Sequence, residues 1–296
     1  MNRRMIFLAI TAIALATLAC SININLPTTQ VKTGPTVTEN INVPLLSDKQ
    51  AVADVTLKFG AGNLTLQPNP GATADLISGT AKYNVTDFKP GITVDNNNIN
   101  IEQGNLKVFG IPAFNSDIVN DWNFSLANAP MNLVINAGAY QGEYELGGLS
   151  IHSLDVTDGA AQANLSFSKP NIVQMTSLQY TTGASEVTLK DLSNAYVTDM
   201  TFRSGAGNYT LDFSGELRSD MTVNIESGVS QVTVIVPEGF NAQVLTETGL
   251  MTVSTRGAWQ QQGSTYSLTG SGNTITLHVK MGAGNLRLET STATIK

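Results

Sequence analysis

Residues 177–190 read SLQYTTGASEVTLK, residues 199–212 read DMTFRSGAGNYTLD and residues 222–235 read TVNIESGVSQVTVI. In each segment the seventh residue is a glycine, and apolar residues stand five and three positions before it and four and six positions after it. A spacing of two indicates a β-strand whose alternate side chains face one interior. Each segment therefore predicts two short strands that are joined by a glycine turn and share one buried side.

The same pattern recurs along most of the chain. Its glycines are Gly60, Gly138, Gly159, Gly183, Gly205, Gly228, Gly249 and Gly282. From Gly138 to Gly249 the steps are 21, 24, 22, 23 and 21 residues. In the row three positions before the glycine, only Thr246 interrupts the apolar residues. Positions between the apolar rows are polar, as in Lys58, Thr181, Arg203, Glu226, Glu247 and Lys280.

A unit of about 22 residues cannot bury its apolar side alone, but stacked units bury a continuous core and pair their backbones. The repeat therefore predicts an all-β protein, a β-solenoid of the right-handed parallel β-helix type. An antiparallel β-sandwich is the alternative, because alternating strands and glycine turns occur in both folds. The constant length of the unit favours the solenoid.

Two segments interrupt the repeat, residues 68–130 and residues 259–272, and we expect them to form loops on one face of the solenoid. The first contains strand-like pieces at residues 75–84 and 98–103. We accordingly expect residues 46–130 to form an N-terminal β unit with an insertion and a cap, and residues 131–296 to form the repeat solenoid.

The N-terminus predicts export and a lipid anchor. Residues 1–19 have a short basic start and an apolar run of about fourteen residues, which is typical of a signal peptide and shorter than the roughly twenty residues that span a bilayer. The run ends in Thr17-Leu18-Ala19-Cys20, which resembles the bacterial lipobox, in which the cysteine receives a diacylglycerol. Two or three acyl chains, such as palmitate, anchor a protein stably.

Residues 20–45 are expected to be the lipidated cysteine and a flexible tether, because Thr, Asn and Pro predominate over buriable side chains. Cys20 is the only cysteine of the chain. We therefore predict a cell-envelope protein that faces outward and is held at a membrane by a lipid on Cys20, on the outer surface of the cytoplasmic membrane or in an outer membrane.

Charge and titratable side chains argue against several functions. The net charge is −7 and only 13% of the residues are charged, whereas nucleic acids and anionic membrane surfaces attract clustered positive charge. Asp54 and Asp199 occupy the same row but lie in distant units, and His152 and His278 occupy different rows. The sequence thus predicts no enzyme, no cofactor and no metal site.

A hexapeptide in the first interruption is the candidate contact segment. Phe109, Ile111 and Phe114 form an apolar cluster among Gly, Pro and Ala. We expect this cluster to be either a lid over the open end of the solenoid, which we favour, or a contact surface for a surface glycan or protein partner. Trp122 and Trp259 are assigned to packing rather than to sugar stacking.

Two polar rows follow the glycine. Three positions after it stand Asn63, Gln141, Gln162, Glu186, Asn208, Gln231, Thr252 and Asn285. Five positions after it stand Thr65, Glu143, Asn164, Thr188, Thr210, Thr233, Ser254 and Arg287. Stacked amides form hydrogen bonds along a stack, and threonine suits an exposed strand, so both rows are interpreted as structural.

The stretches LKFGAGNL at residues 57–64 and LISGTAKYN at residues 76–84, extended by residues 90–103 and 122–170, resemble the toast-rack or LiaF-like bacterial envelope domains and the related putative-adhesin β-helix domains. The resemblance implies a β-helix-like domain at the bacterial surface, linked in some members to envelope stress, and it supplies no catalytic residues. The expected function is that of a non-catalytic surface binding or adhesin-like module. A structural or envelope-stress accessory lipoprotein is the alternative.

Overall fold

The computed structural model describes residues 28–71, 74–106, 111–113, 117–247 and 249–291. The chain divides into two compact units, of which the smaller contains Met1–Lys32 and Leu106–Asp117. In its described part, β1 (Thr28–Gln30) pairs in parallel with β7 (Ile111–Ala113). The predicted signal peptide and Cys20 lie outside the described residues.

The larger unit contains Thr33–Asn105 and Ile118–Lys296 and is built almost entirely of strands. Its elements are β2 (Val37–Pro44), β3 (Ala53–Pro68), β4 (Asp75–Tyr83), η1 (Thr86–Phe88), β5 (Pro90–Asp95), β6 (Asn98–Gln103), β8 (Asn120–Leu126), β9 (Met131–Glu145), β10 (Ile151–Ser166), β11 (Ser177–Lys190), η2 (Leu192–Ala195), β12 (Asp199–Asp212), β13 (Met221–Pro237), β14 (Asn241–Thr246), β15 (Leu250–Arg256), β16 (Gln260–Gln262), β17 (Thr265–Leu268) and β18 (Thr274–Ser291).

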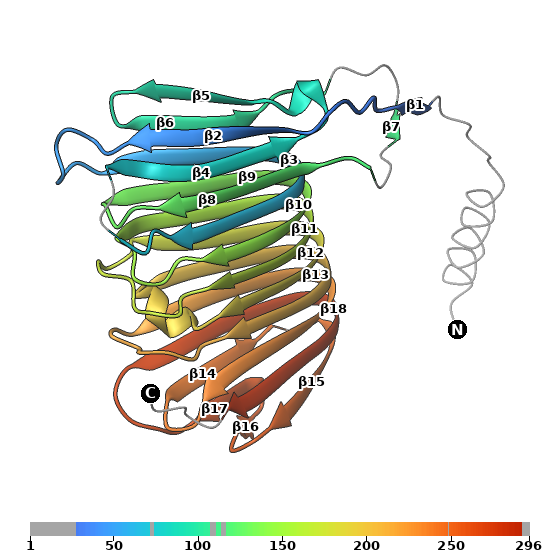
Figure 1. The fold of residues 1–296 in the computed structure, drawn as a ribbon. Helices are drawn as coiled ribbons and strands as arrows, with labels where there is room; N and C mark the ends of the chain where they lie inside the picture. Colours follow the sequence, from blue (N-terminus) through green and yellow to red (C-terminus); the bar gives the residue numbers. More distant parts are fainter. Residues whose placement is uncertain (1–27, 72–73, 107–110, 114–116, 248, 292–296) are drawn as a thin grey trace. The chain divides into compact units, whose positions relative to one another are not determined.

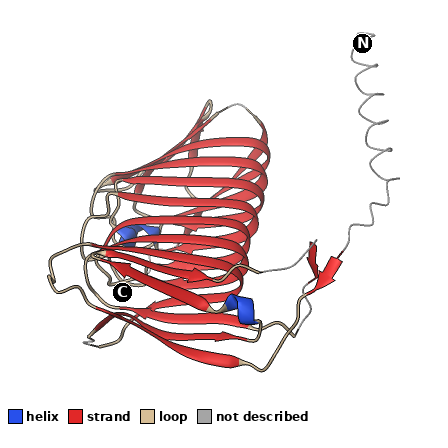
Figure 2. Ribbon diagram, turned by 90° about the horizontal axis from the view of Figure 1, so that it is seen from above, coloured by secondary structure: helices blue, strands red, loops and turns tan. Residues whose placement is uncertain are grey.

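Seven long strands stack in parallel, in the order β3, β9, β10, β11, β12, β13 and β18 (Figure 1). Each long strand belongs to one coil and a return segment leads to the next, so the long strands of successive coils lie side by side (Figure 2). The predicted register is confirmed, since Phe202 of β12 lies between Tyr180 and Ile225 of its two neighbours. The solenoid is therefore the fold. Antiparallel pairs, which a sandwich would need throughout, occur at the two ends of the described stack.

The recurring glycine has a different structural role from the predicted turn between two strands. Seven of the eight glycines lie inside one long bent strand and do not separate two strands, so β12 runs without a break through Gly205. Gly249 alone follows the prediction, since it lies between β14 and β15. The glycines stack on one another: a Cβ on Gly183 would overlap the carbonyl oxygen of Gly159, and a Cβ on Gly205 would lie 2.7 Å from the carbonyl oxygen of Gly183. Glycine thus allows close backbone approach at the bend, and pairing resumes beyond it.

The last two units stack in the reverse of their order in the sequence. β18, which contains Gly282, pairs with β13 on one side and with β14 and β15, the two arms around Gly249, on the other. The physical reason is the completeness of the apolar rows. β18 has apolar side chains in all four rows, whereas the Gly249 unit carries Thr246 and Thr255 in two of them. The incomplete unit therefore lies at the end of the stack.

The two interruptions cover the ends of the solenoid and are not loops on one face. β6 pairs with the first half of β3 and β8 pairs with its second half, so the apolar rows continue through Ile99, Ile101, Trp122 and Phe124. At the other end, β17 and β16 extend the sheet from β14. The predicted strands at residues 75–84 and 98–103 are confirmed as β4 and β6.

Two predicted boundaries are wrong. Residues 37–44, expected in the tether, form β2, which pairs with β4 and buries Ile41 and Val43 in the core. Alternation of Val37, Ile41 and Val43 with polar residues is the signal for this strand. No boundary between compact units falls at residue 130 either, because β3 pairs in register with β9.

Candidate binding surface

Two outward faces follow from the bend. The first arm of a coil comprises the six residues before its glycine, and the second arm comprises the six residues after it. Apolar side chains of both arms point inward, as shown by the fully buried Leu178, Val187 and Leu189 of β11. The intervening side chains point outward, so each coil contributes a few polar side chains to each of the two faces.

On the second arm the two predicted polar rows align in register. Asn208 pairs with Glu186 on one side and with Gln231 on the other, and Thr210 lies between Thr188 and Thr233. Hydrogen bonds between coils occur within both rows: Asn63 donates to Asp121 of β8 at 2.6 Å, and Asn164 donates to Glu143 at 2.7 Å. The second arm is thus a regular polar face that its own side chains help to hold together.

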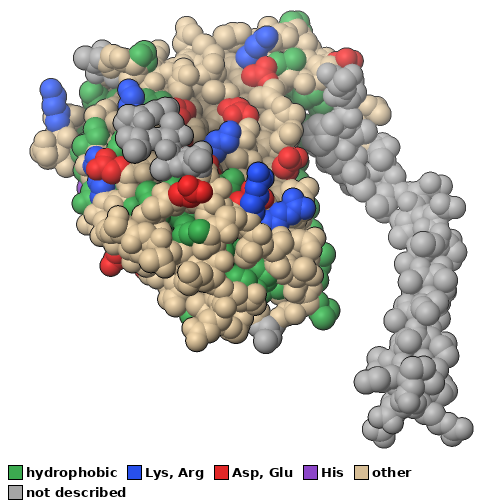
Figure 3. All heavy atoms as spheres, turned by 90° about the horizontal axis from the view of Figure 1, so that it is seen from below, with side chains coloured by type: hydrophobic (Ala, Val, Ile, Leu, Met, Phe, Trp, Pro, Cys, Tyr) green, Lys and Arg blue, Asp and Glu red, His purple; other side chains and the backbone are tan. Residues whose placement is uncertain are grey.

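On the first arm, the row two positions before the glycine carries the charges. Lys58 forms an ion pair with Glu102 of β6 at 3.1 Å, which lowers the pKa of Glu102. Arg203 pairs with Glu226 at 3.3 Å, and Lys280 lies 3.5 Å from Glu247. Charges of opposite sign therefore neighbour one another towards the two ends of this row, and the uncharged Asn136, Thr157 and Thr181 lie between them. Figure 3 shows the same mixing from below, where acidic and basic side chains are interspersed and do not gather by sign.

An open groove of about 670 Å³ runs beside this charged row. It is lined by Thr181, Thr182, Arg203, Ser204, Glu226, Ser227, Gly249, Lys280, Met281 and Gly282. These residues come from four successive strands, β11, β12, β13 and β18, and from the residue before β15. We call this feature the corner groove, because its residues lie at the glycine bend or one or two positions before it. A smaller hollow of about 150 Å³ lies at the other end, around Leu45, Leu46 and Leu76.

A buried polar cluster lies inside the bend behind the corner groove. Asp158 is buried, and its carboxyl group accepts hydrogen bonds from Tyr180 at 2.8 Å, from Tyr140 at 3.3 Å and from Thr182. Thr182 also contacts Ser185, whose hydroxyl oxygen accepts a hydrogen bond from the backbone N–H of Ala161 at 2.8 Å. The side chain of Asp158 is therefore surrounded by donors from its own and neighbouring coils.

A second hydroxyl chain continues along the bend. Ser204 and Ser227 are 2.7 Å apart, and Ser227 and Ser230 are 2.5 Å apart. Sequence reasoning missed both clusters because it followed the apolar rows. The available signal was a polar residue directly before the glycine in four successive units, at Asp158, Thr182, Ser204 and Ser227.

The tyrosines of this cluster act as hydrogen-bond donors. Burial raises the pKa of Tyr180 and Tyr140 above the ordinary value of about 10, and the charge of Asp158 adds to the effect. A tyrosine with a raised pKa keeps its proton at neutral pH. The cluster thus supplies rigidity at the bend and offers no activated nucleophile.

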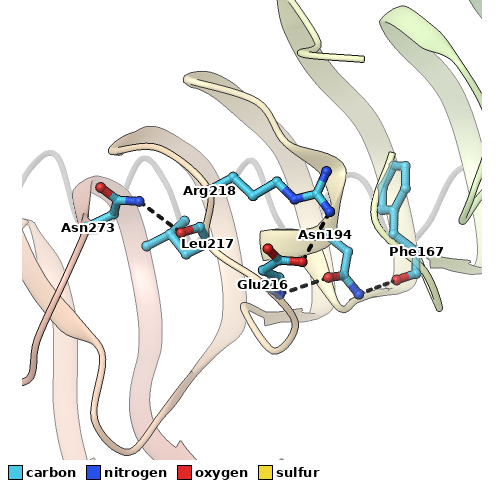
Figure 4. Close-up of polar contacts among 6 residues, drawn as sticks. All are labelled: Phe167, Asn194, Glu216, Leu217, Arg218 and Asn273. Atoms are coloured by element: carbon cyan, nitrogen blue, oxygen red, sulfur yellow. Dashed lines mark hydrogen bonds and ion pairs between the residues drawn. The ribbon is translucent and has the colours of Figure 1, made fainter. Parts of the chain in front are cut away.

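The return segments are joined by asparagine side chains (Figure 4). Asn194 of η2 donates to the carbonyl oxygen of Phe167 at 2.8 Å and accepts from the N–H of Glu216 at 2.8 Å, so one side chain links three successive segments. Beside it, Arg218 contacts Glu216 at 3.1 Å and lies 5.6 Å from the ring centre of Tyr196. Because Asn194 is buried and both ends of its amide are occupied, we assign it to structure.

The predicted contact segment lies mostly outside the described residues. Phe109 and Phe114 are outside them, and Ile111 is described only as part of the backbone of β7. The lid and the partner surface both stay predictions. The lid was expected to cover the open end of the solenoid. That end is covered in part by β6 and β8, which pair with the two halves of β3 in the first coil. Gln103 and Asn120 complete this cover, since Gln103 accepts from the N–H of Gly60 at 2.8 Å.

The tryptophans take the packing roles predicted for them. Trp122 is fully buried, with its ring 5.1 Å from Phe59 and 5.3 Å from Phe124 between ring centres. Trp259 is partly buried against the core. Within the described ranges, no three His, Cys, Asp or Glu side chains are close enough to hold a metal ion. A search of the same ranges finds no helix that is long and apolar enough to cross a membrane.

A parallel β-solenoid with glycine bends and polar outer rows is the class that these observations define. The family model for the N-terminal domain of toast_rack, DUF2154, matches residues 32–176 and again residues 171–235. Because these matches together span more than half of the chain, the protein belongs to the toast_rack family. The second, overlapping match is consistent with the internal repeat.

Several solved structures are similar to the chain. A putative cell adhesion protein from Clostridium sporogenes is 20% identical, with a TM-score of 0.47, and the match covers 87% of this chain and 100% of that one. A putative adhesin from Bacteroides fragilis is 9% identical with a TM-score of 0.37, covering 88% and 99%. A putative lipid binding protein from Parabacteroides distasonis is 11% identical with a TM-score of 0.30, covering 90% and 100%. Comparison with curated proteins finds no match.

Proposed function

We propose that the protein is a non-catalytic lipoprotein of the bacterial cell envelope that acts as a surface binding module. The observation that carries the proposal is the repetition of outward polar rows, in register, over successive coils of the solenoid. Such a surface presents the same kind of hydrogen-bonding group at a regular spacing of about 4.8 Å, the distance between neighbouring strands. A repeating surface suits a repeating or extended partner.

The titratable side chains support a binding role over catalysis. General acid–base catalysis needs two groups that reach one bond of a substrate. The Asp158 cluster is buried and its hydrogen bonds are made internally, whereas the exposed charges of the first arm form ion pairs with each other. Anchoring through a lipid on Cys20, as the lipobox predicts, would hold this surface at the membrane and facing outward.

Binding of the intact, detergent-solubilised chain to cell-envelope preparations tests the proposal. We expect saturable retention on isolated envelopes and none on envelopes stripped of their surface polymers. The alternative, an envelope-stress accessory lipoprotein, predicts no retention on either preparation and altered antibiotic sensitivity after deletion of the gene. That combination would overturn the binding role.

A further inference from the structure

We propose that the corner groove is the recognition site for an extended, neutral glycan strand that lies along the stack axis; this rests on the proposed function. The groove crosses β11, β12, β13 and β18, and each of these strands contributes a residue two positions and a residue one position before its glycine. Four strands at about 4.8 Å spacing extend over roughly 14 Å. A ligand that fills the groove is therefore chain-like and contacts one coil after another.

The charges of the groove favour a neutral ligand. Glu226 lies between Arg203 and Lys280 in register, with Arg203 paired to Glu226 and Lys280 paired to Glu247 just beyond the groove. The two cations and two anions leave no net charge to attract a polyanion or a polycation. They nevertheless offer both donors and acceptors, which suit the hydroxyl groups of a sugar.

The groove is both open and preorganised. The side chains of Arg203, Glu226 and Lys280 are 49%, 55% and 69% exposed, so a ligand reaches them without displacing the fold. Beneath them, Ser227 is held by Ser204 and Ser230, and Thr182 is held by Asp158. Thr182 and Ser227 are themselves buried, so these internal hydrogen bonds fix the floor beneath the exposed side chains, and a fixed floor loses little entropy on binding.

A peptide partner fits the groove less well than a glycan. Peptide grooves depend on apolar or aromatic pockets that receive a few anchor side chains. Met281 is the apolar side chain in this lining, and it is only 2% exposed. Hydroxyl and charged groups make up the accessible lining, so hydrogen bonding along the strand is the recognition that the geometry allows.

The inference is tested by titrating the intact chain with soluble neutral oligosaccharides of increasing length, from disaccharides to hexasaccharides of glucose, mannose and N-acetylglucosamine. We expect one of these series to bind, with an affinity that rises with length until the groove is filled. The double variant Arg203→Ala, Glu226→Ala should weaken binding at least about tenfold. Its fold should persist, because exposed ion pairs contribute little to stability.

The matched control is Lys58→Ala, Glu102→Ala, which removes an equivalent exposed ion pair of the same row outside the groove. This variant should bind as tightly as the unchanged chain. The inference would be overturned if the two double variants bound the oligosaccharide with equal affinity, whether unchanged or weakened. Preferential binding of an extended peptide or of a sulfated polysaccharide would also overturn it. If no oligosaccharide binds but retention on envelopes persists, the groove assignment fails while the binding function stands.

Discussion

Gly207 shows how a single residue decides how closely two coils approach. Its φ of +152° is rarely adopted by other residues, and a Cβ at this position would overlap the carbonyl oxygen of Ser185 in the neighbouring coil. Gly62 and Gly284, which stand at the same place in their units, also have positive φ. The second glycine of the Gly-Ala-Gly stretches is therefore required by the backbone.

We predict that Gly207→Ala lowers the free energy of unfolding by at least about 1–3 kcal/mol. The unfavourable backbone angle alone costs about this much, and the steric overlap adds to it. Chemical denaturation measures the change. Gly71→Ala is the matched control, because a Cβ there would meet no atom within 4 Å and the φ is not in the positive region. Equal stability of the two variants would contradict the close approach.

Tyr180 links residue chemistry to pH. Burial, followed by the charges of Tyr140 and Asp158, raises its pKa, so the folded chain holds this proton more tightly than the unfolded chain does. The associated stability is complete below the unfolded pKa of about 10 and is lost as the pH rises above that value. We predict that the free energy of unfolding, nearly constant between about pH 7 and pH 9, falls steeply above about pH 10.

The variant Tyr180→Phe isolates this contribution. At neutral pH it should lower the free energy of unfolding by about 1–3 kcal/mol, because Asp158 loses its 2.8 Å donor. Above about pH 10 its stability should fall less steeply than that of the unchanged chain, since one titrating group is gone. An identical alkaline slope in both proteins, measured by denaturation at each pH, would rule out the role of Tyr180.

At the scale of elements, one coil derives its stability from rows that it shares with its neighbours. Leu211 of β12 is fully buried between Leu189 of β11 and Val234 of β13. We predict that Leu211→Ala lowers the free energy of unfolding by about 2–5 kcal/mol, from lost burial and from the cavity that remains. Asn208 in the same strand is exposed, so Asn208→Ala should change the free energy of unfolding by no more than about 0.5 kcal/mol. Comparable losses in both variants would contradict the assigned register.

The strands and their register could be predicted from the sequence because apolar residues recur with a period of two around a spaced glycine. Phe202 and Leu211 lie where that pattern places them. The form of the bend could not be predicted, because a glycine suits both a turn between strands and close approach within one strand. The order of the last two units depends on which of them packs next to β13. The polar Thr246 and Thr255, which interrupt the apolar rows of the Gly249 unit, indicate that this unit lies at the end of the stack.

At the scale of the whole molecule, the candidate groove could not be predicted from the sequence. Thr181, Arg203, Glu226 and Lys280 were recognised as outward-facing, but the sequential stacking order would have placed the Gly249 unit between β13 and β18. The observed order brings Lys280 beside Glu226 and thereby completes the alternation of charges. The site thus depends on an exchange of order that the repeat itself does not encode.

The proposed position of the molecule at a membrane depends on Cys20, which lies outside the described residues. We predict that Cys20→Ala abolishes lipid attachment, because the proposed acceptor of the diacylglycerol is this thiol and the chain has no second cysteine. Metabolic labelling with a fatty acid in a bacterium that processes lipoproteins measures attachment, and fractionation shows whether the variant leaves the membrane. Ser21→Ala is the matched control and should keep the label. Label retained on the Cys20 variant would refute the lipid anchor, whereas loss of label with unchanged solenoid stability would separate anchoring from folding.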